Sequence, residues 1–246
     1  MKIVGFANGL ICVNDIIKTN KTMVSLKILL KNKKLIVKSL NMTRMNYRPY
    51  DPSWYLYNKV CKEKNINNKF SNTFIELIYV TLSSWNMNSR GAKLSDFNIF
   101  KKSIIQNKSN IIRLSKYKIN RLSRKDYGYV LGILKELFYK MKLVGKNNNK
   151  RNSEKPRLVT FSKTMHFLLT DLVVPIDRKY TLNFFYNNMS INKKLDLQFK
   201  KFSEIFANCR EFAINTKLKR HLDNDWNLNI PKVIDNIIIG YSKLKK

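Results

Sequence analysis

Apolar residues recur at spacings of three and four positions over most of the chain from residue 53 onward. Side chains with this spacing lie on one face of an α-helix, so the repeat predicts amphipathic helices that each bury one face. The repeat is clearest from Tyr127 to Met141 and from Leu195 to Ala213. We therefore expect residues 53–246 to form a mainly α, multi-helix domain.

Cap residues and prolines place the ends of several of these helices. Thr73 and Glu76 have the spacing of a capping box, which predicts a helix over residues 74–85. Asp96 precedes another apolar repeat and is expected to cap a further helix. Pro231 suits the first turn of a helix and is predicted to open the last one.

The first 48 residues have a different pattern and form a separate N-terminal subregion in this interpretation. Apolar and polar residues alternate over residues 24–30, and a short apolar run follows at residues 35–37. This pattern predicts a β-hairpin, but a helix over residues 23–42 fits the same residues almost as well. A polar, basic run at residues 146–155 predicts a flexible loop inside the helical domain.

The charge balance is the strongest indication of a partner. Among 246 residues, 48 Lys and Arg face 16 Asp and Glu, which gives a formal net charge of +32. An AT-rich genome favours Lys and Asn codons, but a compact body with this charge repels itself unless a polyanion offsets it. We expect a nucleic acid, with RNA favoured over DNA, rather than an anionic membrane surface, because no single amphipathic helix concentrates the charge.

Several other classes of protein do not fit the sequence. No apolar run approaches the roughly 20 residues of a membrane-spanning helix, and the N-terminus does not have the pattern of a secretory signal. The 3 Cys are far apart and there are 2 His, so no disulfide framework, metal site or cofactor is expected. We expect an intracellular protein, of a mitochondrion or another organelle or else of the cytoplasm.

The segment from Lys155 to Thr181 carries the candidate catalytic residues. A helix is predicted over residues 158–172, Pro175 ends it, and Asp177 stands where the next helix begins. Asp177 is either an N-terminal helix cap or a carboxylate aimed into a cleft. His166 is either a hydrogen-bonded core residue or a general base, and Lys163 is either a phosphate contact or a nucleophile.

Cations near this segment and near a second loop are the candidate contacts to phosphates. The second loop is the stretch Trp85–Lys93, in which a glycine and two cations follow a predicted helix. Cations of this kind fix the position of a protein on a nucleic-acid backbone. The candidates are Arg90, Lys93, Lys150, Arg151, Arg157, Lys163, Arg178 and Lys179.

The Pro175-Ile176-Asp177 sequence and the preceding Lys163 resemble the helix-hairpin-helix DNA glycosylase superfamily over about residues 155–186. The resemblance implies an all-α enzyme in which Asp177 serves catalysis on an extruded base and Lys163 forms a Schiff base. The chain departs from the family at the hairpin, because residues 158–161 lack the glycines that let the backbone approach a DNA phosphate.

Two hypotheses follow for the function. In the first, the chain is a structural, RNA-binding component of a ribonucleoprotein such as an organellar ribosome and need not be an enzyme. In the second, it is a DNA-processing enzyme similar to the glycosylases, in which Asp177 is catalytic and Lys163, His166 and Arg178 position the strand.

Overall fold

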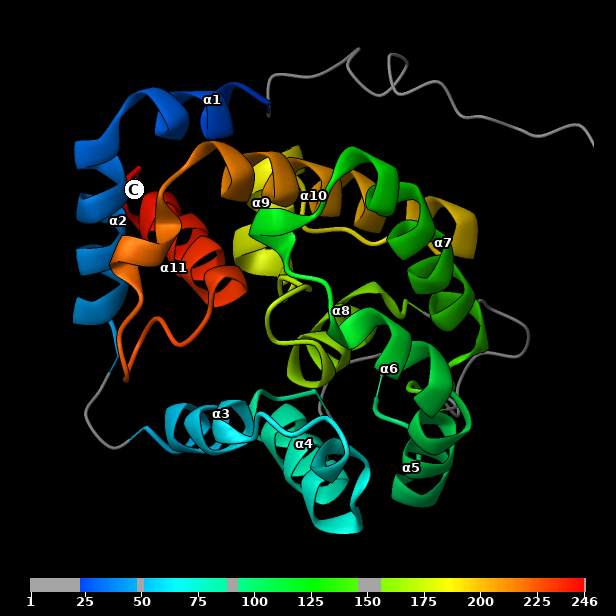
Figure 1. Ribbon diagram of the computed structural model, residues 1–246. Coiled ribbons are helices and arrows are strands. Elements are labelled where there is room, and N and C mark those ends of the chain that lie inside the picture. The colour runs from blue at the N-terminus through cyan, green and yellow to red at the C-terminus, as the bar shows by residue number, and fades with distance from the viewer. Residues whose placement is uncertain (1–22, 48–50, 88–92, 146–155, 246) are drawn as a thin grey trace, which may run out of the picture.

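The computed structural model describes residues 23–47, 51–87, 93–145 and 156–245, and it is mainly α-helical, as the sequence predicts (Figure 1). Its longer helices are α1 (Met23–Lys31), α2 (Lys33–Met45), α3 (Pro52–Lys62), α4 (Asn72–Ser84), α5 (Phe97–Gln106), α6 (Lys108–Ser115), α7 (Arg124–Lys140), α8 (Leu158–Leu168), α10 (Leu195–Asn215) and α11 (Ile230–Leu244). Shorter elements are η2 (Asn68–Phe70), η3 (Ile119–Arg121), η4 (Arg178–Leu182), α9 (Asn183–Tyr186) and η5 (Leu218–His221). The predicted loop at 146–155 lies outside the described residues.

Local side-chain hydrogen bonds start these helices where the sequence allows them. Asp96 caps α5 by accepting a hydrogen bond from the Asn98 amide at 2.9 Å, which confirms that prediction. The predicted capping box at Thr73 is wrong. Ser71 caps α4 instead, because its hydroxyl accepts from the Phe74 amide at 3.2 Å, and Glu76 accepts from the Asn72 side chain.

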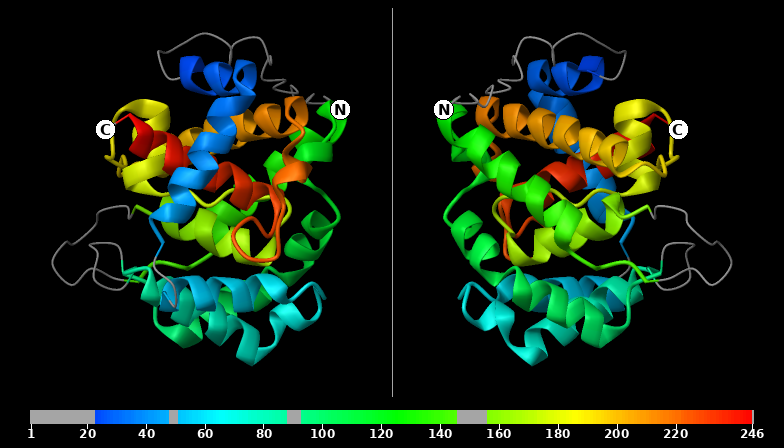
Figure 2. Two further views of the ribbon diagram at one scale, coloured as in Figure 1. Left: turned by 90° about the vertical axis from the view of Figure 1, so that its left-hand side faces the viewer. Right: turned by 90° about the vertical axis from the view of Figure 1, so that its right-hand side faces the viewer.

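Helix α8 lies in the middle of the molecule and is buried on every side. Figures 1 and 2 show it between the layer of α3 and α4 and the layer that contains α10 and α11. All eleven of its residues are buried, including Thr160, Ser162 and Lys163, so the predicted amphipathic helix is in fact a central one. It ends at Leu168, earlier than predicted, where the buried Lys69 ammonium donates to the Phe167 and Leu168 carbonyls.

The described part of the N-terminal subregion is helical. Helices α1 and α2 occupy residues 23–31 and 33–45, which fits the helical alternative for residues 23–42, and Asn32 caps α2. The alternating pattern was ambiguous because a helix with one buried face also spaces its apolar residues closely. Residues 1–22 lie outside the described residues.

Helix α2 packs along α11, and the two backbones come unusually close (Figure 1). The Thr43 hydroxyl donates to the Asn236 carbonyl of α11 at 2.5 Å. Gly240 of α11 makes this approach possible, since a Cβ at this position would lie 1.8 Å from the Ser39 carbonyl oxygen. No helix among the described residues is long and apolar enough to cross a membrane.

Replacing Gly240 by Ala should force α2 and α11 apart. We expect Gly240→Ala to lower the free energy of unfolding by about 3 kcal/mol or more, because overpacking against backbone atoms cannot be relieved by a rotamer change. Gly132→Ala is the matched control: Gly132 lies in α7 with no atom near its would-be Cβ, so this change should stabilise by about 0.5–1 kcal/mol. Urea unfolding measures both values. Equal changes in the free energy of unfolding for Gly240→Ala and Gly132→Ala would contradict the close packing of α2 on α11.

Candidate functional site

Lys163 and Asp177 are brought together by the reversal of the chain after α8. The Lys163 ammonium lies 3.4 Å from the Asp177 Oδ2 atom, and their side chains are 8% and 22% exposed. The same ammonium lies 5.0 Å from the centre of the Trp85 ring, at the end of α4. A charge this deeply buried needs an opposite charge close by, and Asp177 supplies it for Lys163.

Asp177 also caps η4, a single turn of π-helix. Its Oδ1 atom accepts hydrogen bonds from the Lys179 and Tyr180 amides at 2.8 and 3.4 Å, while its own amide donates to the Thr181 hydroxyl. The capping role that the sequence predicted as one alternative is therefore present. One carboxylate oxygen holds the turn and the other faces Lys163, and π-helical turns of this kind are frequent at functional sites.

His166 is a buried residue held by two hydrogen bonds. Its Nδ1 atom lies 2.7 Å from the Val173 carbonyl, and its Nε2 atom lies 2.8 Å from the Tyr57 hydroxyl. A carbonyl only accepts, so Nδ1 donates and Nε2 accepts from Tyr57. Burial lowers the pKa of His166 to about 3. The arrangement fits the core-residue alternative, because a neutral imidazole with both nitrogens engaged is not free to move a proton.

Polar residues that the sequence analysis did not single out surround Tyr57. The Asn229 side chain, at the start of α11, donates to the Tyr57 hydroxyl at 3.5 Å, and the Lys232 ammonium lies 5.1 Å from the centre of the Tyr57 ring. Lys232 pairs with Asp235 at 2.7 Å. Burial lowers the pKa of Lys232, but the Asp235 carboxylate outweighs it and holds the pKa above its usual range. The spacing of three positions between Lys232 and Asp235 is the feature of the sequence that could have indicated this ion pair.

The candidate phosphate contacts have different surroundings. Lys93, Arg178 and Lys179 are exposed, and the Arg178 guanidinium also donates to the Met189 carbonyl at 2.8 Å. Arg157 is half-buried, and its guanidinium donates to the Phe138 and Tyr139 carbonyls at the end of α7. Arg90, Lys150 and Arg151 lie outside the described residues.

Several acidic residues form hydrogen bonds or ion pairs with other residues of the protein. Asp51, Asp96 and Asp177 cap helical elements, and three further carboxylates pair with Lys118, Lys140 and Lys232. Asp223 accepts three backbone hydrogen bonds from its own loop. Much of the small negative charge therefore has a structural role, and most of the cations in the described part of the chain are exposed.

Over the described ranges, His, Cys, Asp and Glu side chains form no group of three that is suited to a metal ion. Comparisons of the chain with protein-family models, with curated proteins and with solved structures find no match. The geometry and the charge are therefore the basis for assigning a function.

The buried state of His166 predicts a loss of stability in acid. The unfolded chain takes up a proton near pH 6.5, whereas the folded protein excludes it down to about pH 3, so stability is present above about pH 6.5 and falls below it. We expect the free energy of unfolding to fall by roughly 1.4 kcal/mol per pH unit below pH 6 from this residue. Urea unfolding from neutral to mildly acidic pH measures the slope.

His166→Gln should remove most of this slope, because glutamine does not titrate. His221→Gln is the control: burial and Arg220 also lower the pKa of His221, but this residue is partly exposed on η5, so its removal should reduce the slope less than His166→Gln does. Equal slopes in the wild-type protein and in His166→Gln would show that His166 does not carry the effect.

Proposed function

We propose that the protein binds nucleic acid, with RNA favoured over DNA, as a structural component of a ribonucleoprotein such as an organellar ribosome. The observation that carries the proposal is the net charge of +32 on a folded helical body in which six of the 16 acidic residues are engaged in caps and ion pairs. Release of counterions from phosphates would favour such a complex and make it sensitive to salt.

One exposed region shows how such contacts would be made. Arg178 and Lys201, from η4 and α10, donate to the carbonyls of Met189 and Ser190 in the loop between these elements. Lys179 is exposed beside Arg178. These bonds hold two cationic side chains at one loop, and a cluster of this kind suits the irregularly directed phosphates of a folded RNA.

Replacing Arg178 and Lys179 by Gln should weaken binding to structured RNA. We expect the slope of the logarithm of affinity against the logarithm of salt concentration to fall by about 1 for each residue that contacts a phosphate. Met189→Gln is the control, because it alters an exposed neighbour without changing the charge and should keep the slope. Absence of binding by the wild-type protein at moderate salt would refute the proposal.

A second candidate function is the DNA-processing enzyme, and the contact between Lys163 and Asp177 favours it. The two residues that the resemblance implies in catalysis are 14 positions apart in the sequence and 3.4 Å apart in the structure. In this proposal Asp177 stabilises cationic character on the sugar as the bond to the base breaks and the base leaves with its electron pair. Water then adds to the sugar carbon, and its proton passes through Asp177 to the released base, while Lys163 and Arg178 position the strand. His166 would support the site through its neighbours in α8 rather than through proton transfer.

Asp177→Asn separates the two candidates. Under the first proposal the wild-type protein releases no base from a duplex that holds one damaged base, and the variant binds RNA as well as the wild type or slightly better. Base release by the wild type that is lost in Asp177→Asn, with DNA binding kept, would favour the enzyme. Asp171→Asn is the control, because Asp171 pairs with Lys118 at the surface and should change neither property.

A further inference from the structure

One continuous segment of the chain, residues 97–125, carries many cations and no carboxylate. Between Asp96 and Asp126 the sequence has nine Lys and Arg and no Asp or Glu. The segment forms α5, α6, η3 and the start of α7, and Figure 1 shows these three helices along one side of the molecule. Eight of the nine cations are exposed: Lys102, Lys108, Arg113, Lys116, Lys118, Arg121, Arg124 and Lys125.

The turn that carries several of these cations is held firmly to the rest of the fold. Helix α6 packs against α5 before it and against α7 after it. Between α6 and α7, the Ile119 amide donates to the Asp171 carbonyl at 2.9 Å. The Arg210 guanidinium of α10 donates two hydrogen bonds to the Leu122 carbonyl, at 2.9 and 2.6 Å. A partner that binds this surface therefore does not have to order the backbone beneath it.

Two tyrosines lie on this surface, where α6 ends beside α7. The rings of Tyr117 and Tyr129 have centres 6.2 Å apart and are inclined by 55°, and Tyr129 is 51% exposed. The Lys116 ammonium lies 5.2 Å from the centre of the Tyr117 ring. Lys125 is exposed one helical turn before Tyr129 on the same face of α7. Cations from the end of α6 and from α7 therefore flank an exposed aromatic ring.

The carboxylates close to this surface already have partners. Across the part of the chain that the structure describes, Lys118 is the one cation of the segment in an ion pair, 3.0 Å from Asp171. The Asp126 carboxylate accepts a hydrogen bond from the Ser123 hydroxyl at 2.6 Å, at the start of α7. The positive charge beside Tyr129 is therefore not offset within the described fold, and phosphates of a nucleic acid would supply the opposite charge.

We infer that the surface formed by the end of α6 and the first turns of α7 binds an unpaired stretch of a nucleic-acid strand. The exposed ring of Tyr129 stacks on one base, and Lys116 and Lys125 contact the phosphates on either side of that base. The inference rests on the proposed nucleic-acid binding and adds that this surface takes unpaired strands rather than duplexes.

The aromatic ring is the reason for an unpaired strand. In a duplex the faces of each base are covered by its neighbours, so a tyrosine on the protein surface cannot stack on them without opening the helix. Stacking on an aromatic ring tolerates any sequence, because every base has a π-face. We therefore expect this surface to discriminate between unpaired and paired RNA and to discriminate little among the bases.

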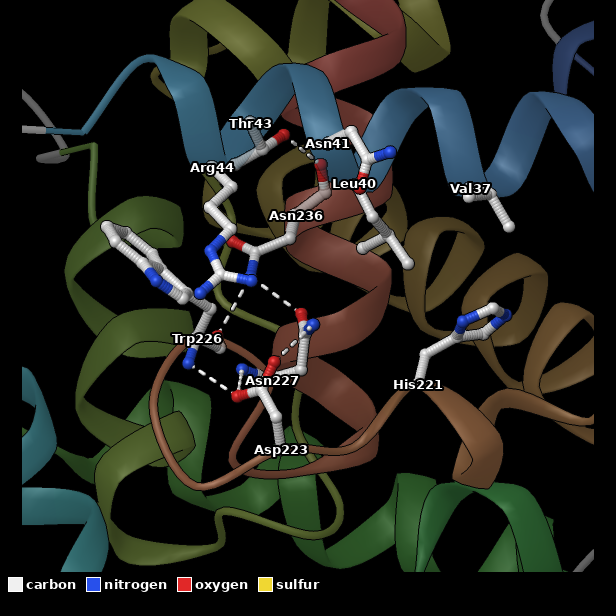
Figure 3. Close-up of a pocket in the computed structure, with 10 residues that line it drawn as sticks. All are labelled: Val37, Leu40, Asn41, Thr43, Arg44, His221, Asp223, Trp226, Asn227 and Asn236. Atoms are coloured by element: carbon white, nitrogen blue, oxygen red, sulfur yellow. Dashed lines mark hydrogen bonds between the residues drawn. The ribbon is translucent and has the colours of Figure 1, made fainter.

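A pocket of about 140 Å³ between α2 and α11 does not offer another place for the base (Figure 3). Asn236, Asn227 and Asp223 line it, and their side chains bond to one another in sequence, at 3.0 Å in both contacts. The Asn236 Oδ1 atom accepts no hydrogen bond from a described group, but it is buried and so is not accessible to a ligand.

Tyr129→Ser removes the ring, and Tyr129→Phe keeps it. Binding is measured by fluorescence anisotropy with two labelled probes of equal length, an RNA strand that forms no base pairs and an RNA duplex. We expect Tyr129→Ser to lose about tenfold in affinity for the single strand and less than about twofold for the duplex, whereas Tyr129→Phe keeps both affinities. Retained binding of the duplex also shows that the variant is folded.

Tyr55→Ser is the matched control for the ring. Tyr55 is 62% exposed on α3, and the Lys59 ammonium lies 5.8 Å from the centre of its ring, so this residue also combines an exposed tyrosine with a lysine. It lies outside the proposed surface, and its replacement should change neither affinity.

A double variant, Lys116→Gln with Lys125→Gln, tests the cations. The slope of the logarithm of single-strand affinity against the logarithm of salt concentration should fall by roughly 0.7 for each phosphate contact that is lost. The control is Lys59→Gln with Lys62→Gln, which removes the same charge from two exposed positions on α3 and should keep the slope.

The possible outcomes separate the inference from the function on which it rests. If the wild type binds RNA but Tyr129→Ser and the double variant behave like their controls, this surface is not the binding surface and nucleic-acid binding stands. Equal losses for strand and duplex in Tyr129→Ser, or an equal loss in Tyr129→Phe, would show that the ring does not stack on a base and would overturn the inference. If the wild type binds neither probe, the proposed function and the inference both fail.

Discussion

The complete burial of α8 is the constraint on which the rest of the structure depends. A helix in the middle of a protein has no water to satisfy its polar groups, so most of those it carries have a partner from another element. The Ser162 hydroxyl accepts from the Ile176 amide, His166 bridges Val173 and Tyr57, and Lys163 reaches Asp177. These contacts fix the returning chain over residues 173–177 and thereby set the position of η4.

Local signals in the sequence were enough to predict much of the fold. The apolar repeats predicted α7, α10 and α11, and the Asp96 cap placed the start of α5, because these features depend only on neighbouring residues. For residues 24–37 the same local signals left a hairpin and a helix as alternatives. The pattern was compatible with either structure, and the packing of α2 on α11 supplies the additional information.

The candidate site was only partly predictable, because its contacts are distant in sequence. The helix-cap role of Asp177 follows from its place before a helix, but the partner of His166 is Tyr57, 109 positions away. The contacts of Asn236 could not be predicted from neighbouring residues, because they are made with Thr43 of α2 and with Trp226 and Asn227 of the loop before α11. The residue pattern allowed Lys163 to be either a phosphate contact or a nucleophile, whereas the burial of α8 places its ammonium beside Asp177 inside the protein.

The close contact at Gly240 also affects the order in which the protein can fold during synthesis. The Thr43 hydroxyl and the Asn236 carbonyl that it contacts are 193 positions apart, so α2 leaves the ribosome long before α11 exists. Until then, the face of α2 that carries Ser39 and Thr43 lacks α11 to pack against. The long stretch of chain between α2 and α11 can be closed by this contact only after α11 has been synthesised. The contact between α2 and α11 is therefore among the last features to form, because it exists only in a chain whose second described helix has docked on its last.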